Sequence, residues 1–183
     1  MARNVQTTIR PTETECPVCG VRLVLPIGPP GARGLIVGDR PGEWELERGR
    51  PFVPQAPAGR VLHHEMIRAG LCLDDFRMTN VWLHAPNDVC LDWHVEQCRR
   101  EAHGRQAVLL LGSIACRAFL EQNVMQVSGL VIKVKDAKTR MLPKGTFVVS
   151  APNPAEVLHG SVGELRLSLK RFFEAYKKLK GKT

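Results

Sequence analysis

The stretch LIVGDRPGEWELERGRPFV, residues 35–53, joins an apolar segment directly to a turn rich in glycine and proline. Asp39 follows the apolar letters at once, glutamates come soon after, and the chain then returns to Phe52 and Val53. Glycine and proline are usual in a surface turn, but a turn alone does not explain an acidic residue directly after a buried strand or the later return to apolar residues. We therefore interpret residues 35–53 as a buried strand followed by a loop that serves a function.

The same kind of apolar run recurs along the chain, alternating with amphipathic segments. The predicted strands are residues 34–38, 77–83, 107–112, 130–134 and 146–150, and the predicted helices are residues 59–70, 91–104, 113–123 and 163–181. Such alternation is typical of βαβ crossovers. We predict an α/β fold, a three-layer domain with a central, mostly parallel four-stranded sheet flanked by helices. Ligands bind at the carboxyl ends of such strands, so the loops after Val37, Trp82, Leu111 and Val149 are the candidate site.

Length and composition fit one domain over residues 1–183, with residues 16–34 as an N-terminal cysteine-knuckle segment. The net charge of +8 favours a polyanionic partner such as nucleic acid. The alternative is a protein with a basic tail, since residues 170–182 carry six of the positive charges. The chain has neither an apolar h-region nor an apolar run long enough for a bilayer, so we expect a cytoplasmic protein that does not bind membranes.

Six cysteines in a cytoplasmic chain indicate metal ligands or buried small side chains rather than disulfides. Cys16 and Cys19 form a Cys-x-x-Cys knuckle in the sequence ECPVCGVRL. Cys72 and Cys116 lie in apolar surroundings and are predicted to be core residues. The histidines at positions 63, 64, 94 and 103 are predicted to lie on the surface.

The loop after the first strand carries a more specific signal. It resembles the first motif of the iron–sulfur-containing uracil-DNA glycosylases of bacteria and archaea. The shared residues, with the same spacing, are Gly38, Pro41, Gly42, Glu45, Gly49, Pro51, Phe52 and Val53. A glycosylase holds its flipped base between apolar and aromatic groups. The resemblance implies that Phe52 stacks on the base, that backbone amides of the turn at Gly38 contact its carbonyls, and that Asp39 or Glu45 positions the attacking water. Taken alone, Phe52 would be interpreted as a core aromatic.

Two further positions extend the resemblance. Asn80, in TNVWL, matches an asparagine that contacts the polar edge of uracil, and an amide can donate and accept there in one plane. Asn153-Pro154 stands where the family has His-Pro. Asn153 can donate a hydrogen bond to the leaving base but cannot carry the positive charge of an imidazolium. Asn-Pro at this place is similar to the mismatch-directed uracil and thymine glycosylases of the same superfamily.

The loop also departs from the family motif. Asp39 replaces a glutamate, and Pro54 replaces a glycine after Pro-Phe-Val. Arg40 replaces a small residue, where its cation could contact phosphate or block the pocket mouth. These changes predict a reshaped pocket and leave the identity of the base open.

The resemblance also implies a 4Fe-4S cluster on four cysteines, and tetrahedral zinc in the same set is the alternative. Cys16 and Cys19 match the first two ligands and Cys98 the last. The third ligand position is occupied by Leu83-His84, so Cys90 is the preferred third ligand and His84 its alternative.

These observations predict a monomeric DNA glycosylase that hydrolyses the N-glycosidic bond of uracil or a related base. The rival hypothesis is a protein of the same fold that binds DNA as an accessory factor and has lost the chemistry. The missing histidine, Arg40 and Pro54 favour the rival.

Overall fold

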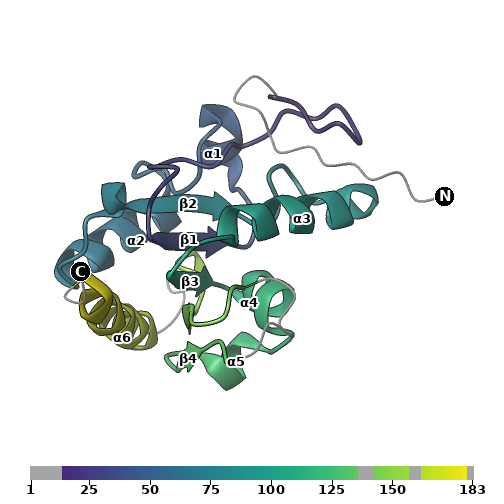
Figure 1. Ribbon diagram of the computed structural model, residues 1–183. Coiled ribbons are helices and arrows are strands. Elements are labelled where there is room, and N and C mark those ends of the chain that lie inside the picture. Colours follow the sequence, from purple (N-terminus) through teal and green to yellow (C-terminus); the bar gives the residue numbers. More distant parts are fainter. Residues whose placement is uncertain (1–13, 136–141, 157–161, 181–183) are drawn as a thin grey trace.

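The computed structural model describes residues 14–135, 142–156 and 162–180, and it is built around one twisted sheet (Figure 1). The strands lie in the order β2-β1-β3-β5-β4. Their bounds are Gly34–Gly38 for β1, Phe76–Asn80 for β2, Ala107–Leu111 for β3, Val131–Lys133 for β4 and Phe147–Ala151 for β5. All neighbouring strands run parallel except β4, which is antiparallel to β5. The α/β prediction is therefore confirmed, but the sheet has five strands where four were expected, because all five predicted strands join it and β4 forms a short antiparallel edge.

The helices follow the predicted segments with small differences at their ends. They are α1 (Glu43–Arg48), α2 (Pro57–Arg68), α3 (Leu91–Ala102), α4 (Ser113–Leu120), α5 (Val124–Val127) and α6 (Val162–Lys180), with 3₁₀ turns η1 (Leu73–Asp75) and η2 (Asp88–Cys90). Sequence analysis assigned the α1 and α5 segments no helix of their own, and both are short. The predicted strand 77–83 ends at Asn80, after which the chain turns beside the β1 loop.

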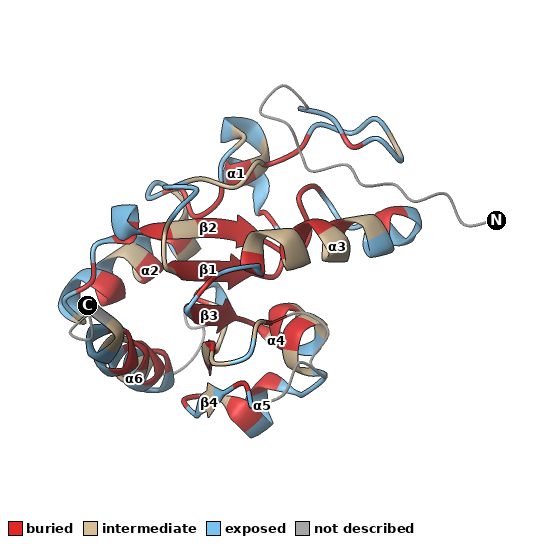
Figure 2. Cartoon of the chain, viewed as in Figure 1, coloured by how far each residue is buried: buried red, intermediate tan, exposed pale blue. Residues whose placement is uncertain are grey.

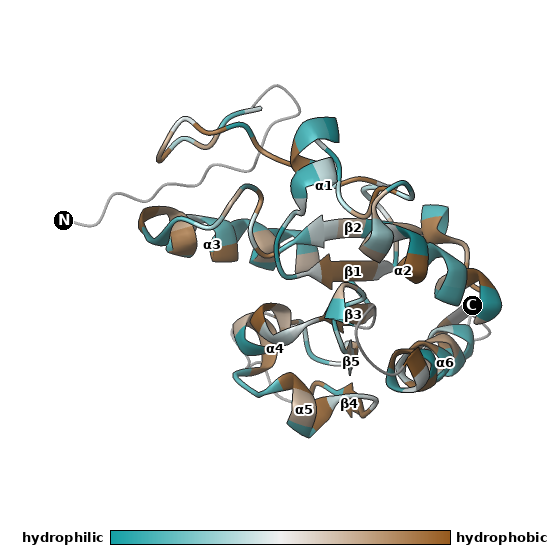
Figure 3. Ribbon diagram, turned by 180° about the vertical axis from the view of Figure 1, so that it is seen from behind, coloured by the Kyte–Doolittle hydropathy of each residue, from teal (hydrophilic) through white to brown (hydrophobic). Residues whose placement is uncertain are grey.

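Two apolar cores cover the two faces of the sheet, in which β1 and β3 are buried throughout, whereas the edge strand β4 is exposed or half-buried (Figure 2). On one face α2 and α6 pack on side chains such as Ile36 and Leu109. On the other, α3, α4 and α5 pack on their sequence neighbours, such as Leu35 and Leu110. Strand residues alternate between the faces, so β1 is hydrophobic along its length (Figure 3). The result is the predicted three-layer arrangement.

The N-terminal segment lies along the free edge of β2. Ile27 forms an antiparallel bridge with Met78, and the Val24 N–H donates to the Leu83 carbonyl at 2.6 Å. Arg105 fixes the following loop, because its Nη1 donates to the Pro30 carbonyl at 2.7 Å. The knuckle is thereby held beside the residues that follow β2.

Two predictions about single side chains are wrong. Cys72 is exposed because it precedes η1, where Leu71 and Leu73 take the buried positions. His94 is fully buried because its α3 face packs against the segment after β2. Cys116 is buried, as predicted. Among the described helices, none combines the length and apolarity needed to cross a bilayer.

Candidate functional site

A cleft of about 730 Å³ opens at the carboxyl ends of the parallel strands. The register aligns these ends, since Gly38 pairs with both Asn80 and Leu111, and Leu111 pairs with Ala151. The cleft lies where the chain order reverses around β1, which is the usual ligand position in open α/β sheets. Its walls are the loop after β1, the N-terminal ends of α2 and α4, Asn80, and residues 153–156.

The loop after β1 is organised by the buried carboxylate of Glu45. The N–H of Gly42 donates to its Oε2 at 2.8 Å, and the N–H of Phe52 donates to its Oε1. Burial raises the pKa of Glu45, and the two backbone donors oppose this rise. Both carboxylate oxygens are thus occupied by the protein, so in this geometry Glu45 shapes the loop.

Phe52 has a strained backbone, with φ of 52° in a residue that bears a bulky side chain. Its N–H is held by Glu45, and its carbonyl lies 3.0 Å from His63 Nε2. On α2, a Cβ at Gly59 would lie 2.0 Å from the Val53 carbonyl oxygen, so the helix packs directly on this backbone. Three contacts therefore fix a conformation that costs of order 1–3 kcal/mol, and such strain concentrates at functional sites.

Asn80 and the Phe52 ring meet above Gly38. A Cβ at Gly38 would lie 2.3 Å from Asn80 Oδ1 and 2.9 Å from Phe52 Cζ, so only glycine leaves both side chains in place. Asn80 is 2% exposed. Its amide lies near Glu45 and helps to lower the pKa of that carboxyl, yet Nδ2 reaches hydrogen-bond geometry with no described residue. The lining of the cleft therefore contains a buried donor without an acceptor in the described part of the chain.

Asp39 anchors the start of α4 from the end of β1. Its Oδ1 accepts the N–H of Ala115 at 2.7 Å, and the Asn153 amide lies near the carboxylate, where it acts to lower the pKa of Asp39. Asn153 Oδ1 accepts the N–H of Ala155 at 2.9 Å, which leaves the Asn153 amide hydrogens for other partners. Burial raises the pKa of Asp39, the Ala115 amide opposes it, and the charge of Glu156 adds to the rise. The structure thus brings Asp39 and Asn153 together at one wall.

The cleft is acidic despite the net charge of the chain. Its lining includes the carboxylates of Asp39, Glu43, Glu45 and Glu156 and one cation, the exposed Arg40. Trp44 on α1 lies at the same wall with 45% of its side chain exposed. Attraction for a phosphate backbone must therefore come from Arg40 and from surfaces outside the cleft.

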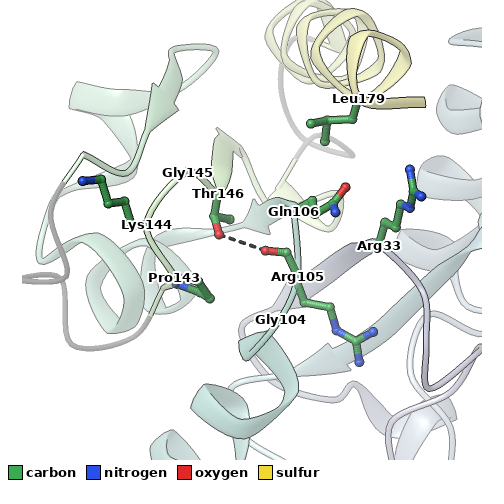
Figure 4. A pocket seen from close by; sticks show the side chains of 9 residues that line it. All are labelled: Arg33, Gly104, Arg105, Gln106, Pro143, Lys144, Gly145, Thr146 and Leu179. Atoms are coloured by element: carbon green, nitrogen blue, oxygen red, sulfur yellow. Dashed lines mark hydrogen bonds between the residues drawn. The ribbon is translucent and has the colours of Figure 1, made fainter. Parts of the chain in front are cut away.

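A smaller pocket of about 430 Å³ lies at the opposite end of the strands (Figure 4). Arg33, Arg105 and Lys144 contribute to its lining. Arg105 already donates to backbone carbonyls, and its own carbonyl accepts the Thr146 hydroxyl at 2.9 Å, so the guanidinium serves the fold. This pocket lies away from the strand ends that carry the motif residues, and we place the site in the larger cleft.

Next to the cleft, thiols and imidazoles converge in a group that could bind a metal. Coordinating atoms of Cys16, His84, Cys90 and His94 all lie within 4.8 Å of one another, and these four residues are buried. Cys19 joins them, with its Sγ 3.4 Å from His84 Nε2. Burial and the neighbouring thiols raise the pKa of Cys90 to about 12, and burial with the charge of His84 lowers the pKa of His94 to about 4.

Cys98, the predicted fourth cysteine ligand, lies outside this group. Its Sγ is 3.4 Å from the Asn80 carbonyl, and it packs in the core between α3 and the sheet. Burial raises its pKa well above the usual range. The structure thus joins Cys16, Cys19 and Cys90 with His84, and places Cys98 against β2.

A comparison of the sequence with models of protein families agrees with the fold and the cleft described above. The chain matches the model of the uracil DNA glycosylase superfamily over residues 25–180. The chain belongs to this superfamily. The match covers the sheet, the cleft and the six helices of the described residues, and it begins after the cysteine knuckle.

Sequence reasoning named seven residues of the cleft lining in this superfamily member, but it did not name Trp44 there and it assigned His94 of the metal group to the surface. The catalytic and base-binding residues predicted from the sequence all line the same cleft: Gly38, Asp39, Arg40, Glu45, Phe52, Asn80 and Asn153. Trp44 was overlooked because a tryptophan among glutamates gives no periodic signal. His94 was overlooked because a histidine on an amphipathic helix is usually a surface residue, although its ten-residue spacing from His84 could have been considered.

Proposed function

We propose that this protein is a DNA glycosylase that hydrolyses the N-glycosidic bond of uracil or a related deaminated or modified base. The observation that carries the proposal is Asn80, a buried residue of the cleft lining whose Nδ2 has no hydrogen-bond acceptor among the described residues. A buried polar group without a partner costs about 1–3 kcal/mol, and a base carbonyl in the cleft would remove that cost. The adjacent Phe52 ring supports the proposal, because it offers a stacking face for a flipped base.

In the proposed reaction the bond between the sugar C1′ and the base nitrogen breaks, and the bonding electrons leave with the base. Asn80 and Asn153 donate hydrogen bonds to the base as negative charge develops on its carbonyl oxygen. Asp39 accepts a proton from the water that attacks C1′. The bond from Ala115 holds the Asp39 carboxylate in place for this role. Glu45 acts as a positioning residue that holds Phe52.

A second candidate is an accessory DNA-binding protein that has lost the chemistry. Two observations favour it: the acidic lining of the cleft and the turn in which Asn153 Oδ1 is bound to Ala155. Arg40, exposed at the rim, could then contact a phosphate while the cleft stays empty of a base.

For the metal group we propose that it stabilises the N-terminal knuckle and takes no part in the reaction. The resemblance implies a 4Fe-4S cluster, with zinc as the alternative. The short distances between the ligand atoms support a single ion.

The test uses labelled oligonucleotides that carry uracil opposite guanine, opposite adenine or unpaired, followed by alkali. The proposal predicts strand breaks at the uracil that disappear in Phe52→Ala and Asn80→Ala. Salt-sensitive binding without breaks would favour the accessory protein. If the wild type does not cleave, Asn153→His shows why. Cleavage of uracil gained by this substitution would mean that the base pocket is intact and that only the histidine is missing.

A further inference from the structure

We infer that Cys16, Cys19, Cys90 and His84 bind one tetrahedral zinc ion, and that a four-iron cluster does not fit this group. The inference concerns the metal group alone and holds whether or not the cleft is catalytic.

The distances between ligand atoms decide between one ion and a cluster. Cys16 Sγ lies 3.9 Å from Cys90 Sγ, and Cys19 Sγ lies 3.4 Å from His84 Nε2. Zinc bonds of about 2.3 Å to sulfur and about 2.0 Å to nitrogen place tetrahedral ligand atoms roughly 3.5–3.8 Å apart. In a cubane each thiolate binds its own iron, so the body of the cluster keeps the sulfurs much further apart. The observed spacing matches one ion.

Hydrogen bonding selects His84 rather than His94 as the imidazole ligand. His84 Nδ1 lies 2.6 Å from the Ala85 carbonyl, which requires a proton on Nδ1 and leaves the lone pair of Nε2 free to bind a metal. His94 has the opposite arrangement, because its Nδ1 accepts the Leu83 N–H at 3.4 Å. Its proton is therefore on Nε2, which lies 2.9 Å from His84 Nε2.

His94 then has a role beside the ion rather than on it. When His84 Nε2 binds the metal, the His94 N–H needs another acceptor, and the Sγ atoms of Cys16 and Cys90 lie within 4.8 Å of a ring nitrogen of His94. An N–H donor stabilises a thiolate ligand. We assign His94 as this donor.

The fold gives such an ion a structural purpose. The apolar cluster beneath the knuckle is small, with Leu23, Trp82 and Leu83 packed beside Cys16 and Cys90. The ion would join the knuckle to the residues after β2 and to the start of α3. Since the Trp82 N–H donates to the Asp39 carbonyl at 3.0 Å, this junction also borders the cleft.

The experiment measures metal content and optical spectra of the full chain purified without oxygen from cells supplied with both iron and zinc. We expect a colourless protein with about one zinc per chain. Cys98→Ser, the matched control, should keep its zinc, and His84→Ala should lose it. His84→Cys should still bind one ion, and its Co²⁺ form should show stronger sulfur-to-metal charge transfer than the wild type.

Several results would overturn the inference. A brown protein with iron and sulfide would establish a cluster, and a folded protein without metal would remove the site. Loss of zinc from Cys98→Ser, or its retention in His84→Ala together with loss from His94→Gln, would show that the ligands are assigned wrongly.

Discussion

Phe52 shows how single residues depend on their neighbours at this site. A phenylalanine with positive φ persists only where its surroundings hold it, and here Glu45, His63 and the backbone contact at Gly59 do so. The resemblance could predict that Phe52 lies at the site. It could not predict the strain, because the strain arises from contacts between segments that are distant in sequence.

At Gly38 the space for a side chain is filled by Asn80 and Phe52. We predict that Gly38→Ala lowers base release by about 100-fold, because displacement of a positioning group by an ångström has such effects. Gly42→Ala is the matched control in the same loop. Its added Cβ meets nothing within 4 Å and its φ is −82°, so it should retain activity. An equal loss of base release in both variants would show that activity depends on the loop as a whole and not on the position of the Asn80 side chain.

Asp39 gives a prediction that depends on pH. Burial raises the pKa of Asp39 above its ordinary value of 3.8 in the folded state. The protonated carboxyl therefore contributes to the stability of the fold below pH 3.8, and this contribution is lost as the pH rises through the folded pKa, because the buried group must then ionise. Asp39→Asn avoids that loss. It should unfold at a higher temperature than the wild type at neutral pH, and the difference should shrink as the pH falls through the folded pKa and be lost below pH 3.8.

The same variant should release base at least about 100-fold more slowly, since it cannot accept the proton of the water. Thermal unfolding across pH and single-turnover base release measure the two effects. An Asp39→Asn protein that is less stable at neutral pH, or that retains full activity, would contradict the assigned role.

At the scale of elements, the sheet register is what assembles the cleft. Four parallel strands end level, so the loops after them converge although they are far apart in sequence. Apolar runs made these strands predictable. The segment EWELER of α1 was not, because most of its side chains are exposed and it shows no helical stripe. The metal group could not be derived from spacing, since the loop between His84 and Cys90 decides which side chains meet.

Helix α6 tests the packing of one face. Leu165 is fully buried against the sheet, whereas Leu167 on the same helix is 46% exposed. We predict that Leu165→Ala lowers the free energy of unfolding by about 2–5 kcal/mol, because it leaves a cavity. Leu167→Ala should change it by less than about 0.5 kcal/mol. Denaturant unfolding measures both, and similar losses would mean that α6 packs with a different face.

At the scale of the whole molecule, the net charge of the chain and the charge of the cleft lining are opposite in sign. The chain carries +8, while the cleft lining is mainly acidic. Sequence composition could predict the first and not the second, because composition does not show that the loop after β1 carries three of the carboxylates and that folding brings Glu156 beside them. A DNA backbone would therefore be bound by Arg40 and by cations around the cleft.

Binding to DNA should accordingly weaken steeply as salt rises, since phosphate contacts release counterions. Arg40→Ala should reduce the slope of log affinity against log salt by about 1. Arg117→Ala is the control, since Arg117 is exposed in the last turn of α4, away from the end that lines the cleft. Fluorescence anisotropy across a salt series measures the slopes. Tighter binding by Arg40→Ala would indicate that Arg40 blocks the mouth.

The most direct measurement is the identification of free bases released from DNA by the purified protein. DNA treated to deaminate and alkylate its bases would be incubated with the wild type and with Asn80→Ala, and the small-molecule fraction analysed by mass spectrometry. Our account predicts that the wild type releases a free base, uracil or a related one, and leaves abasic sites in equal amount, while Asn80→Ala releases far less. No free base above the level of untreated DNA, from a folded protein that binds the same DNA, would contradict the proposal of a glycosylase.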